Sequence, residues 1–269
     1  MLTKFAAEGD GPAIHITPER IFDLSGQPIS NSVFYGWVSS AVIIVLLVFI
    51  ARRMTLKPKR GLFQFVELGT EFIISTLSGS LGSRAKAVKY APYFVTTFFF
   101  VMLSNWLGLM PGVGEALTLG ETPVLRPFTA DLNGTLAAAT VMMIFVQVFA
   151  IKESGFIKHM RHYFAGSLKN PGTWLLGIFE LFSEITRICS LALRLFLNVA
   201  IGEVIIAIFT YLGGPVAPVS ALPFILLELF VGALQAYIFV MLCAMYLGAA
   251  IHHDHESDQH EADARLAEA

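Results

Sequence analysis

The chain has 269 residues, of which 55% are hydrophobic and 14% are charged, and its formal net charge at pH 7 is -2. A mean hydropathy of +0.68, with recurring apolar runs of about 20 residues, excludes an ordinary soluble domain and indicates a polytopic membrane protein. The charge argues against nucleic-acid binding, which needs a basic patch. Cys189 and Cys243 both fall in apolar segments, so we expect neither a disulfide framework nor a CxxC metal site.

The amino-terminal part predicts an arm, one crossing and a surface helix. Residues 1–32 are polar and lack a basic n-region, so we expect an external arm and no signal peptide. The first span covers about 33–51 and ends in a basic cluster. Residues 61–81 separate polar from apolar side chains at helical spacing, which predicts a helix lying along the membrane surface. A helix that packs on soluble parts of other subunits is the alternative.

Four further spans follow, at about 91–110, 135–151, 171–212 and 221–251. Together with the first span they predict a single all-α membrane domain over 33–251 with five crossings. The tail, 252–269, is rich in histidine and acidic residues. Its composition favours a solvated, disordered cytoplasmic segment over a metal site.

Lysine and arginine counts predict the orientation. Segments 52–90 and 152–170 hold eight and four of these residues, whereas 1–32, 111–133 and 213–221 hold two, one and none. Basic loops stay on the cytoplasmic side. We therefore expect an external amino terminus and a cytoplasmic carboxyl terminus, which requires an odd number of crossings.

The last two spans are too long to cross the membrane upright. The stretch from Pro171 to Leu212 has 42 residues, or ~63 Å of helix at ~1.5 Å per residue, against a hydrocarbon thickness of ~30 Å. A continuous helix must tilt by roughly 60°. The alternative is a break, although no proline inside the stretch forces one. The final helix should tilt as well, which gives a steeply inclined antiparallel hairpin.

Arg194 lies inside this long apolar run. An arginine keeps its charge in a protein, and its placement at mid-bilayer costs at least ~2.5–3.5 kcal/mol on insertion scales, so it marks a functional site. Its polar neighbours are ordered along the helix. A stripe about 80° wide holds Arg194 and four of these neighbours, Glu180, Glu184, Arg187 and Asn198. Glu203 faces another direction, about 140° from the centre of the stripe.

Folding the hairpin about residue 217 brings polar residues of its two limbs to the same level. Glu203 then lies within three residues of Glu228, near the external end, and Gln235 lies beside Asn198 and one turn from Arg194. Toward the cytoplasm follow the remaining members of the stripe, Arg187, Glu184 and Glu180.

This order suggests two proton paths with a barrier between them. Carboxylates in a partly wet, low-dielectric site can exchange protons near neutral pH. Arg194 cannot release its proton and therefore interrupts the path. A moving partner must carry the proton past it, and the natural partner is a carboxylate on another subunit that Arg194 holds ionised until the carboxylate turns away.

Three motifs carry a resemblance to a known family. They are the run Arg194-Leu195-Phe196-x-Asn198, then Gly202-Glu203, and then Gln235-Ala236-Tyr237-Ile238-Phe239. In this combination the chain resembles subunit a of the F-type ATP synthase. The likeness extends to residues 105–111 and to the five-crossing layout, and it covers most of the chain from residue 33 onward. Leu197 departs from the pattern, because many members have glycine there.

The resemblance implies a proton-translocating stator subunit that forms two offset half-channels and couples proton flow to rotation of the c-subunit ring. Arg194 would face the ring carboxylate and block leak. Four residues would serve the external half-channel, Glu203, Glu228, Asn198 and Gln235. Glu180, Arg187 and Ser190 match positions near the cytoplasmic half-channel, to which the stripe adds Glu184.

The resemblance also implies the setting of this subunit. Its partners would be the c ring, subunit b of the peripheral stalk, the remaining synthase subunits and the lipid bilayer, in a bacterial plasma membrane. It would have no catalytic site of its own, no cofactor and no metal.

The charged residues admit simpler structural interpretations. Arg194 could be neutralised within the chain by Glu228 or Glu203, as an ion pair that holds the hairpin together. Glu184 and Arg187 are three residues apart on a helix, which also suits a local ion pair.

The uncharged polar residues and the function class are open to a second interpretation as well. Asn198 and Gln235 could only bridge two helices by hydrogen bonds, and Tyr246 suits an interfacial anchor. A secondary antiporter would act alone, although neither a repeat nor Gly/Pro interruptions support it. A Na⁺-coupled form of the synthase is also open, but the chain has no dense cluster of oxygen ligands, which favours H⁺.

Overall fold

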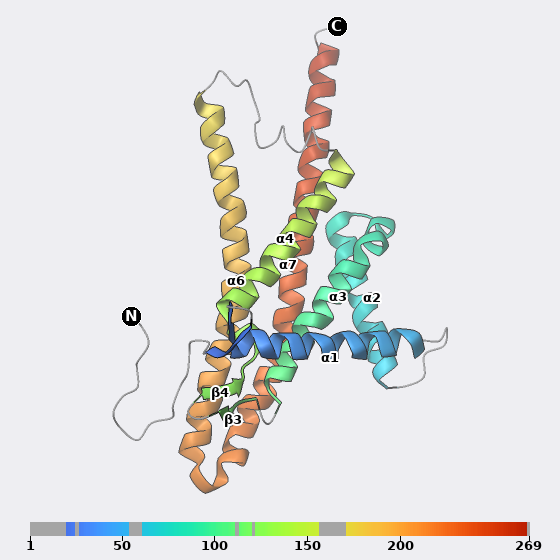
Figure 1. Cartoon of the computed structure of the whole chain (residues 1–269). Coiled ribbons are helices and arrows are strands. Elements are labelled where there is room, and N and C mark those ends of the chain that lie inside the picture. The colour runs from blue at the N-terminus through green and yellow to red at the C-terminus, as the bar shows by residue number, and fades with distance from the viewer. Residues whose placement is uncertain are drawn as a thin grey trace.

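The computed structural model describes residues 20–24, 27–53, 61–110, 113–119, 122–155 and 171–267. Long α-helices make up most of this part, and Figure 1 shows their arrangement. Their bounds are α1 Asn31–Arg53, α2 Leu62–Leu81, α3 Arg84–Gly108, α4 Leu132–Ser154, α6 Pro171–Gly213 and α7 Ala217–Ala267. Two short 3-10 helices accompany them, η1 Phe128–Ala130 and η2 Gly214–Val216.

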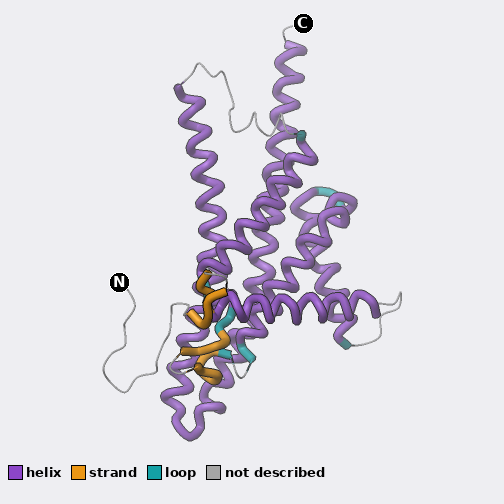
Figure 2. The backbone as a smooth tube through the Cα atoms, in the orientation of Figure 1, coloured by secondary structure: helices purple, strands orange, loops and turns teal. Residues whose placement is uncertain are grey.

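The predicted all-α membrane fold is confirmed. Four apolar helical segments are long enough to cross a membrane, and the last of them, Gly177–Ile251, contains both limbs of the hairpin. Because η2 turns the chain back between α6 and α7, these limbs count separately and make five. Two small antiparallel pairs add to the helices, β1 Arg20–Leu24 with β2 Gln27–Ser30 and β3 Gly114–Leu119 with β4 Thr122–Leu125. β2 and β4 both contact α1, and Figure 2 draws the two pairs in orange near the start of that helix.

Several helices extend beyond the apolar runs that predicted them. α3 begins at Arg84, seven residues before the expected span, and α7 continues as helix to Ala267 through the tail that we expected to be disordered. The hydropathy of a segment marks only its apolar part. In the tail, a helix that has already formed propagates at little cost, and residues 252–267 contain no Gly or Pro to end it. Side chains beyond Ile251 lie outside the described part.

The long helix of the hairpin is continuous. α6 has 43 residues, or ~65 Å at ~1.5 Å per residue, whereas α1 has 23 residues, or ~35 Å. In Figure 1, α1 runs across the direction of α6 and α7. The length of α1 matches a bilayer of ~30 Å. If α1 crosses upright, the hairpin therefore lies at a steep tilt, as its length required.

The turn of the hairpin is held by a side-chain hydroxyl and by stacked rings. Ser220 Oγ donates to the Phe209 carbonyl at 2.8 Å, and Gly214 has φ +47°, a conformation that favours glycine. The Phe209 and Phe224 rings stack with their centroids 3.8 Å apart. We call this end of the hairpin, where η2 joins the two limbs, the turn end.

A buried core joins the hairpin to α2, α3 and α4. Its largest fully buried side chains include Phe94 and Met102 of α3, Leu195 of α6 and Phe239 of α7. Phe72 of α2 adds a ring contact to Tyr237 of α7, with centroids 4.9 Å apart, while Phe72 itself is 51% exposed. The predicted surface helix is therefore a helix, α2, and its inner face packs on α3 and α7.

Toward the turn end, but well short of η2, α1 and α4 begin side by side. Asp131 is the N-cap of α4 and accepts a hydrogen bond from the Asn133 backbone N at 3.0 Å, which satisfies one of the free N–H groups of the first turn. The other Asp131 oxygen accepts from Ser32 Oγ at 2.6 Å. η1, which precedes Asp131, packs against α1, α3, α4 and α6. These contacts fix η1 beside the hairpin.

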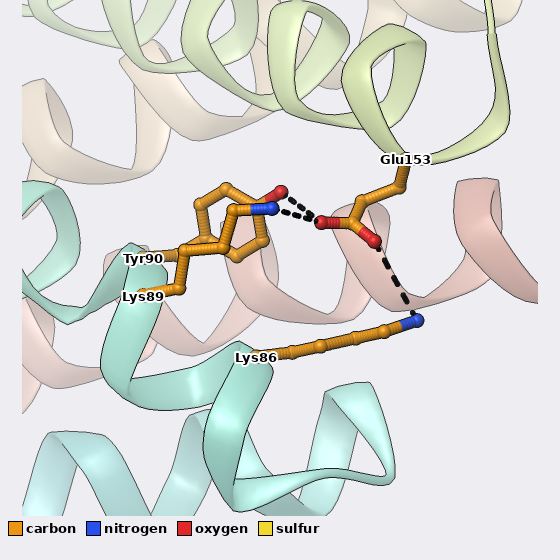
Figure 3. A network of polar contacts seen from close by, with 4 residues as sticks. All are labelled: Lys86, Lys89, Tyr90 and Glu153. Atoms are coloured by element: carbon orange, nitrogen blue, oxygen red, sulfur yellow. Dashed lines mark hydrogen bonds and ion pairs between the residues drawn. The ribbon is translucent and has the colours of Figure 1, made fainter.

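At the opposite end, one carboxylate joins α3 to α4 (Figure 3). Glu153 Oε1 lies 2.6 Å from Lys89 Nζ and also accepts from the Tyr90 hydroxyl, and Glu153 Oε2 lies 3.7 Å from Lys86 Nζ. Arg84 pairs with Glu71 of α2 at 2.8 Å nearby. Three basic residues of the 52–90 segment, Arg84, Lys86 and Lys89, are thus partly neutralised by Glu71 and Glu153.

Candidate functional site

Arg194 lies on an exposed face of α6, in the middle of the helix. Within the described ranges no hydrogen bond or ion pair to its guanidinium is found, so this part of the structure contains no ion pair of Arg194 with Glu203 or Glu228. Leu193, Leu197 and Ile201 are exposed around it, by 44%, 47% and 55%. The permanent cation therefore stands in an apolar surface of the bundle.

The structure brings together Glu203 and Glu228. Glu228 of α7 reaches across the hairpin so that its carboxylate lies against Gly202 of α6, in the space that a Cβ atom on Gly202 would occupy. Both carboxylates are half-buried, and they lie close enough to interact electrostatically. The sequence predicted that Glu203 and Glu228 lie at nearly the same distance from the turn, and the contact of Glu228 with Gly202 agrees with it. The prediction works because both helices are continuous between the turn and these residues.

Asn198 and Gln235 lie at the next level along the hairpin. The contact of Gly202 with Glu228 on one side, and of Arg187 with Tyr246 on the other, brackets them between α6 and α7. The Asn198 Nδ2 and Gln235 Nε2 atoms are buried, and neither has a hydrogen-bond partner among the described residues. Among the described residues, these two nitrogen atoms therefore do not bridge the helices by hydrogen bonds.

Helix α3 lines the same level from the other side. Asn105 Nδ2 donates to the Gly232 carbonyl at 3.2 Å and Trp106 Nε1 donates to the Leu229 carbonyl at 2.9 Å. Both acceptors lie on α7 close to Glu228. These two bonds fix the height of α7 against α3, and with it the position of Glu228.

The polar residues toward the open end of the hairpin are partly occupied with one another. Arg187 Nη1 lies 2.6 Å from Glu184 Oε1, so these two form the local ion pair that was one of the two interpretations. The Arg187 guanidinium also lies 5.1 Å from the centroid of the Tyr246 ring on α7. Tyr246 is thus a cation–π partner of Arg187 across the hairpin, and its predicted role as an interfacial anchor stays a prediction. Ser190 is exposed, and Glu180 is half-buried.

Sequence reasoning missed one charged residue of the site. Arg126, which precedes η1, is 4% exposed, and its charge acts on Glu203. It is the single Lys or Arg of the 111–133 segment, where it counted only toward the orientation. A lone arginine in an otherwise uncharged stretch before a predicted span is the signal that could have identified Arg126. Nothing in the sequence around it, however, indicates a contact with the hairpin. Among the described residues no cluster of possible metal ligands occurs.

The long apolar helices carry a permanent cation on an exposed face and half-buried carboxylates between two limbs. These features define a polytopic membrane protein with charged groups on and within its helical bundle. The model of the ATP synthase A chain family matches residues 33–248. The chain therefore belongs to this family, that of subunit a of the ATP synthase.

Three relatives show how far the likeness reaches. ATP synthase subunit a of Chlorobium phaeobacteroides is 33% identical over 258 residues, which cover 90% of this chain and 70% of the relative. The same subunit of Campylobacter concisus is 35% identical over 222 residues, which cover 80% and 88%. That of Syntrophobacter fumaroxidans is 30% identical over 248 residues, which cover 90% and 93%.

Membership defines the general role of the chain. It is a multi-pass, non-catalytic subunit of the membrane sector of the ATP synthase, it serves proton transport, and its partners are the other subunits of that complex. The antiporter that acts alone is therefore the wrong function class.

Proposed function

We propose that this chain is the stator half of a rotary proton channel, with Arg194 as the fixed charge between two half-channels. The observation that carries the proposal is the exposed Arg194 in its apolar surface. A cation in such a surface needs a negative counter-charge, which the rest of the described chain does not supply. A ring of c subunits, each with a carboxylate at that depth, meets the need and gives Arg194 a new partner at every step.

On the turn side we assign Glu203, Glu228, Asn198 and Gln235 to the external half-channel. The Glu228 carboxylate lies against Gly202, the chain neighbour of Glu203, and the two amides at the next level have buried N–H groups without partners among the described residues. Buried polar groups in proteins nearly always bind protein or water. An aqueous path at this level satisfies the amides and connects the carboxylates to Arg194.

On the other side we assign Glu180, Glu184, Arg187 and Ser190 to the cytoplasmic half-channel. Glu184 and Arg187 neutralise each other, so they suit the wall of the path better than its proton carriers, and Glu180 and Ser190 remain as the groups that line it. This assignment also sets the orientation. The basic segments 52–90 and 152–170 would face the cytoplasm, and the turn end would face the outside of a bacterial plasma membrane.

The remaining partner is subunit b of the peripheral stalk, which would hold this chain still while the ring turns. We assign H⁺ as the ion, because the described residues hold no cluster of oxygen ligands and a relay of carboxylates suits proton transfer. The protein needs no cofactor or metal in this role.

The test is made in the whole synthase, reconstituted in vesicles. Arg194→Ala should abolish ATP-driven proton pumping while the complex still assembles and hydrolyses ATP. Arg84→Ala removes an exposed, paired arginine and is the matched control. Normal coupled pumping by the Arg194 variant would refute the proposal. Transport by the unaltered complex that requires Na⁺ would keep the rotary role and overturn the ion assignment.

A further inference from the structure

Helix α6 carries a second arginine, Arg187, on the same stripe as Arg194. No other Lys or Arg occurs in α6, and a step of seven residues turns a helix to within about 20° of its starting direction. The two residues are ~10.5 Å apart along the axis, at ~1.5 Å per residue. At an inclination of roughly 60°, this distance becomes ~5 Å of depth and ~9 Å in the membrane plane. A carboxylate that moves sideways past one arginine therefore comes close to the other.

Arg187 is engaged within the hairpin. Its Nη1 donates to Glu184 Oε1 at 2.6 Å, and its guanidinium lies 5.1 Å from the centroid of the Tyr246 ring on α7. The Glu184 side chain is only 14% exposed, so solvent screens this bond little. A charge-assisted hydrogen bond and a cation–π contact both stabilise a guanidinium in its place. The charge of Arg187 is thus compensated by its own chain, and its side chain is held toward α7.

Arg194 differs from Arg187 in both respects. Its side chain is exposed, and among the described residues its guanidinium has no carboxylate and no aromatic ring as a partner. The ion pair of Arg187 with Glu184 is neutral as a unit, whereas Arg194 offers a full positive charge to a partner. One stripe of α6 therefore holds two cations, of which one is compensated and the other is not.

We propose that Glu184 and Tyr246 are positioning residues that keep Arg187 away from the ring carboxylates, so that Arg194 is the cation these carboxylates bind. This deepens the proposed function and rests on it. A ring carboxylate that has released its proton beside Glu180 passes Arg187 before it reaches Arg194. An uncompensated Arg187 would hold that carboxylate ionised at a second position and would slow its transfer to Arg194.

The two members of the ion pair are not equivalent in this role. Loss of the Glu184 charge leaves a guanidinium, which keeps its charge in a protein. Loss of Arg187 leaves a carboxyl group, which a proton can neutralise. We therefore expect removal of the Glu184 charge to be the more damaging change, and removal of Arg187 to repair it. An ion pair that only stabilised the helix would lose the same contact from either side.

The experiment uses the whole synthase in vesicles and measures proton-driven ATP synthesis per assembled complex. Glu184→Gln should slow synthesis about tenfold, which corresponds to a barrier higher by ~1.4 kcal/mol. Arg187→Gln should slow it by no more than about threefold, because the remaining carboxyl group can become neutral. Glu71→Gln is the matched control, since it removes the carboxylate of an exposed pair with Arg84 and should leave the rate unchanged.

Double variants separate the charge of Arg187 from the structure of the pair. Glu184→Gln combined with Arg187→Gln should be several times faster than Glu184→Gln alone, whereas independent losses would multiply. Glu184→Gln combined with Arg187→Lys keeps an uncompensated cation and should stay slow. Should Glu184→Gln fail to assemble, the double variant with glutamine should restore assembly and the one with lysine should not.

The ring of Tyr246 is tested in the same assay. Tyr246→Phe keeps the aromatic face and should keep most of the rate, whereas Tyr246→Leu removes it and should slow synthesis about two- to fivefold. Adding Arg187→Gln to each of these variants should remove the difference between them. Equal rates of Tyr246→Phe and Tyr246→Leu would overturn the role of the ring.

Three results would overturn the role of Glu184. They are a normal rate in Glu184→Gln, a double variant with glutamine that is no faster or still fails to assemble, and equal rates of the two double variants. The proposed function fails separately, because normal pumping by Arg194→Ala refutes the rotary role whatever Glu184 does. An inactive Arg194→Ala variant, beside a slow Glu184→Gln variant that loss of Arg187 does not repair, refutes only the positioning of Arg187.

Discussion

Gly202→Ala is the sharpest test of the position of Glu228. A Cβ atom on Gly202 would lie 2.6 Å from Glu228 Oε1 and closer still to the other carboxylate atoms, whereas ordinary contact begins at 3.4 Å. The carboxylate must therefore move by at least 0.8 Å, the difference between these two distances. It is the far end of a flexible side chain, so it can move at little cost.

The variant should separate stability from function. Alanine is favoured over glycine in a helix interior by about 1 kcal/mol, so the hairpin should be no less stable. Shifts of about 1 Å in a reacting group can cost up to ~10²-fold in rate. A relay that includes water tolerates larger shifts of a carboxylate than a direct contact does. We therefore expect proton-driven ATP synthesis in the reconstituted synthase to fall about tenfold, while the amount of assembled complex stays the same.

Two further variants define what the result means. Gly79→Ala is a matched control in α2, because an added Cβ atom there meets nothing within 4 Å. Adding Glu228→Asp to Gly202→Ala shortens the acid by one methylene and should recover part of the lost rate. Wild-type synthesis by Gly202→Ala would show that the carboxylate does not need the place it occupies, and the assignment of Glu228 to the relay would be wrong.

The remaining predictions concern stability. Glu153→Gln weakens the contacts to Lys86 and Lys89, and since Lys89 is 58% exposed we expect only a small fall in the temperature of unfolding, with normal pumping. Thermal unfolding in detergent measures it, and a loss of coupling would contradict a structural role. Asp131→Ala removes the N-cap of α4 and the partner of Ser32, and it should lower the free energy of unfolding by about 1–2 kcal/mol. Asp131→Asn can still cap the helix and should keep most of the stability in the same assay. Equal melting temperatures of the two variants would contradict the role of Asp131 as the cap.

The hairpin was predictable because its order follows from helix geometry alone. Glu203 and Glu228 lie on two unbroken helices joined by a short turn, so counting residues from the turn is enough to bring them to one level. Pro171 at the start and the glycines at the turn gave the limits of α6, and the structure ends it at Gly213. The predicted end of the last helix at about residue 251 was too early, because hydropathy does not report how far a helix continues into a polar segment.

Arg126 and Gly202 were not predictable in the same way. A single arginine in a connecting segment has no period, and its burial depends on η1 packing against α6, a contact far apart in the sequence. Gly202 belongs to a motif, yet the reason for a glycine appears only when the Glu228 carboxylate lies against it. Both depend on which side chain of one helix meets which backbone of another, and the pattern of either segment alone does not contain that information.

The tilt of α6 would give the two proposed half-channels a sideways separation. Glu203 and Glu180 are 23 residues apart in the sequence, which is ~35 Å along the helix. If α6, at ~65 Å, spans ~30 Å of hydrocarbon, it is inclined by roughly 60°, so this distance divides into about 17 Å of depth and about 30 Å in the membrane plane. An upright helix would stack the two paths and leave Arg194 as the whole of the barrier. In the proposed mechanism, a proton that enters beside Glu203 on an inclined helix has to be carried sideways before it can leave beside Glu180. Sideways transport in the membrane plane is the motion that a turning ring would supply.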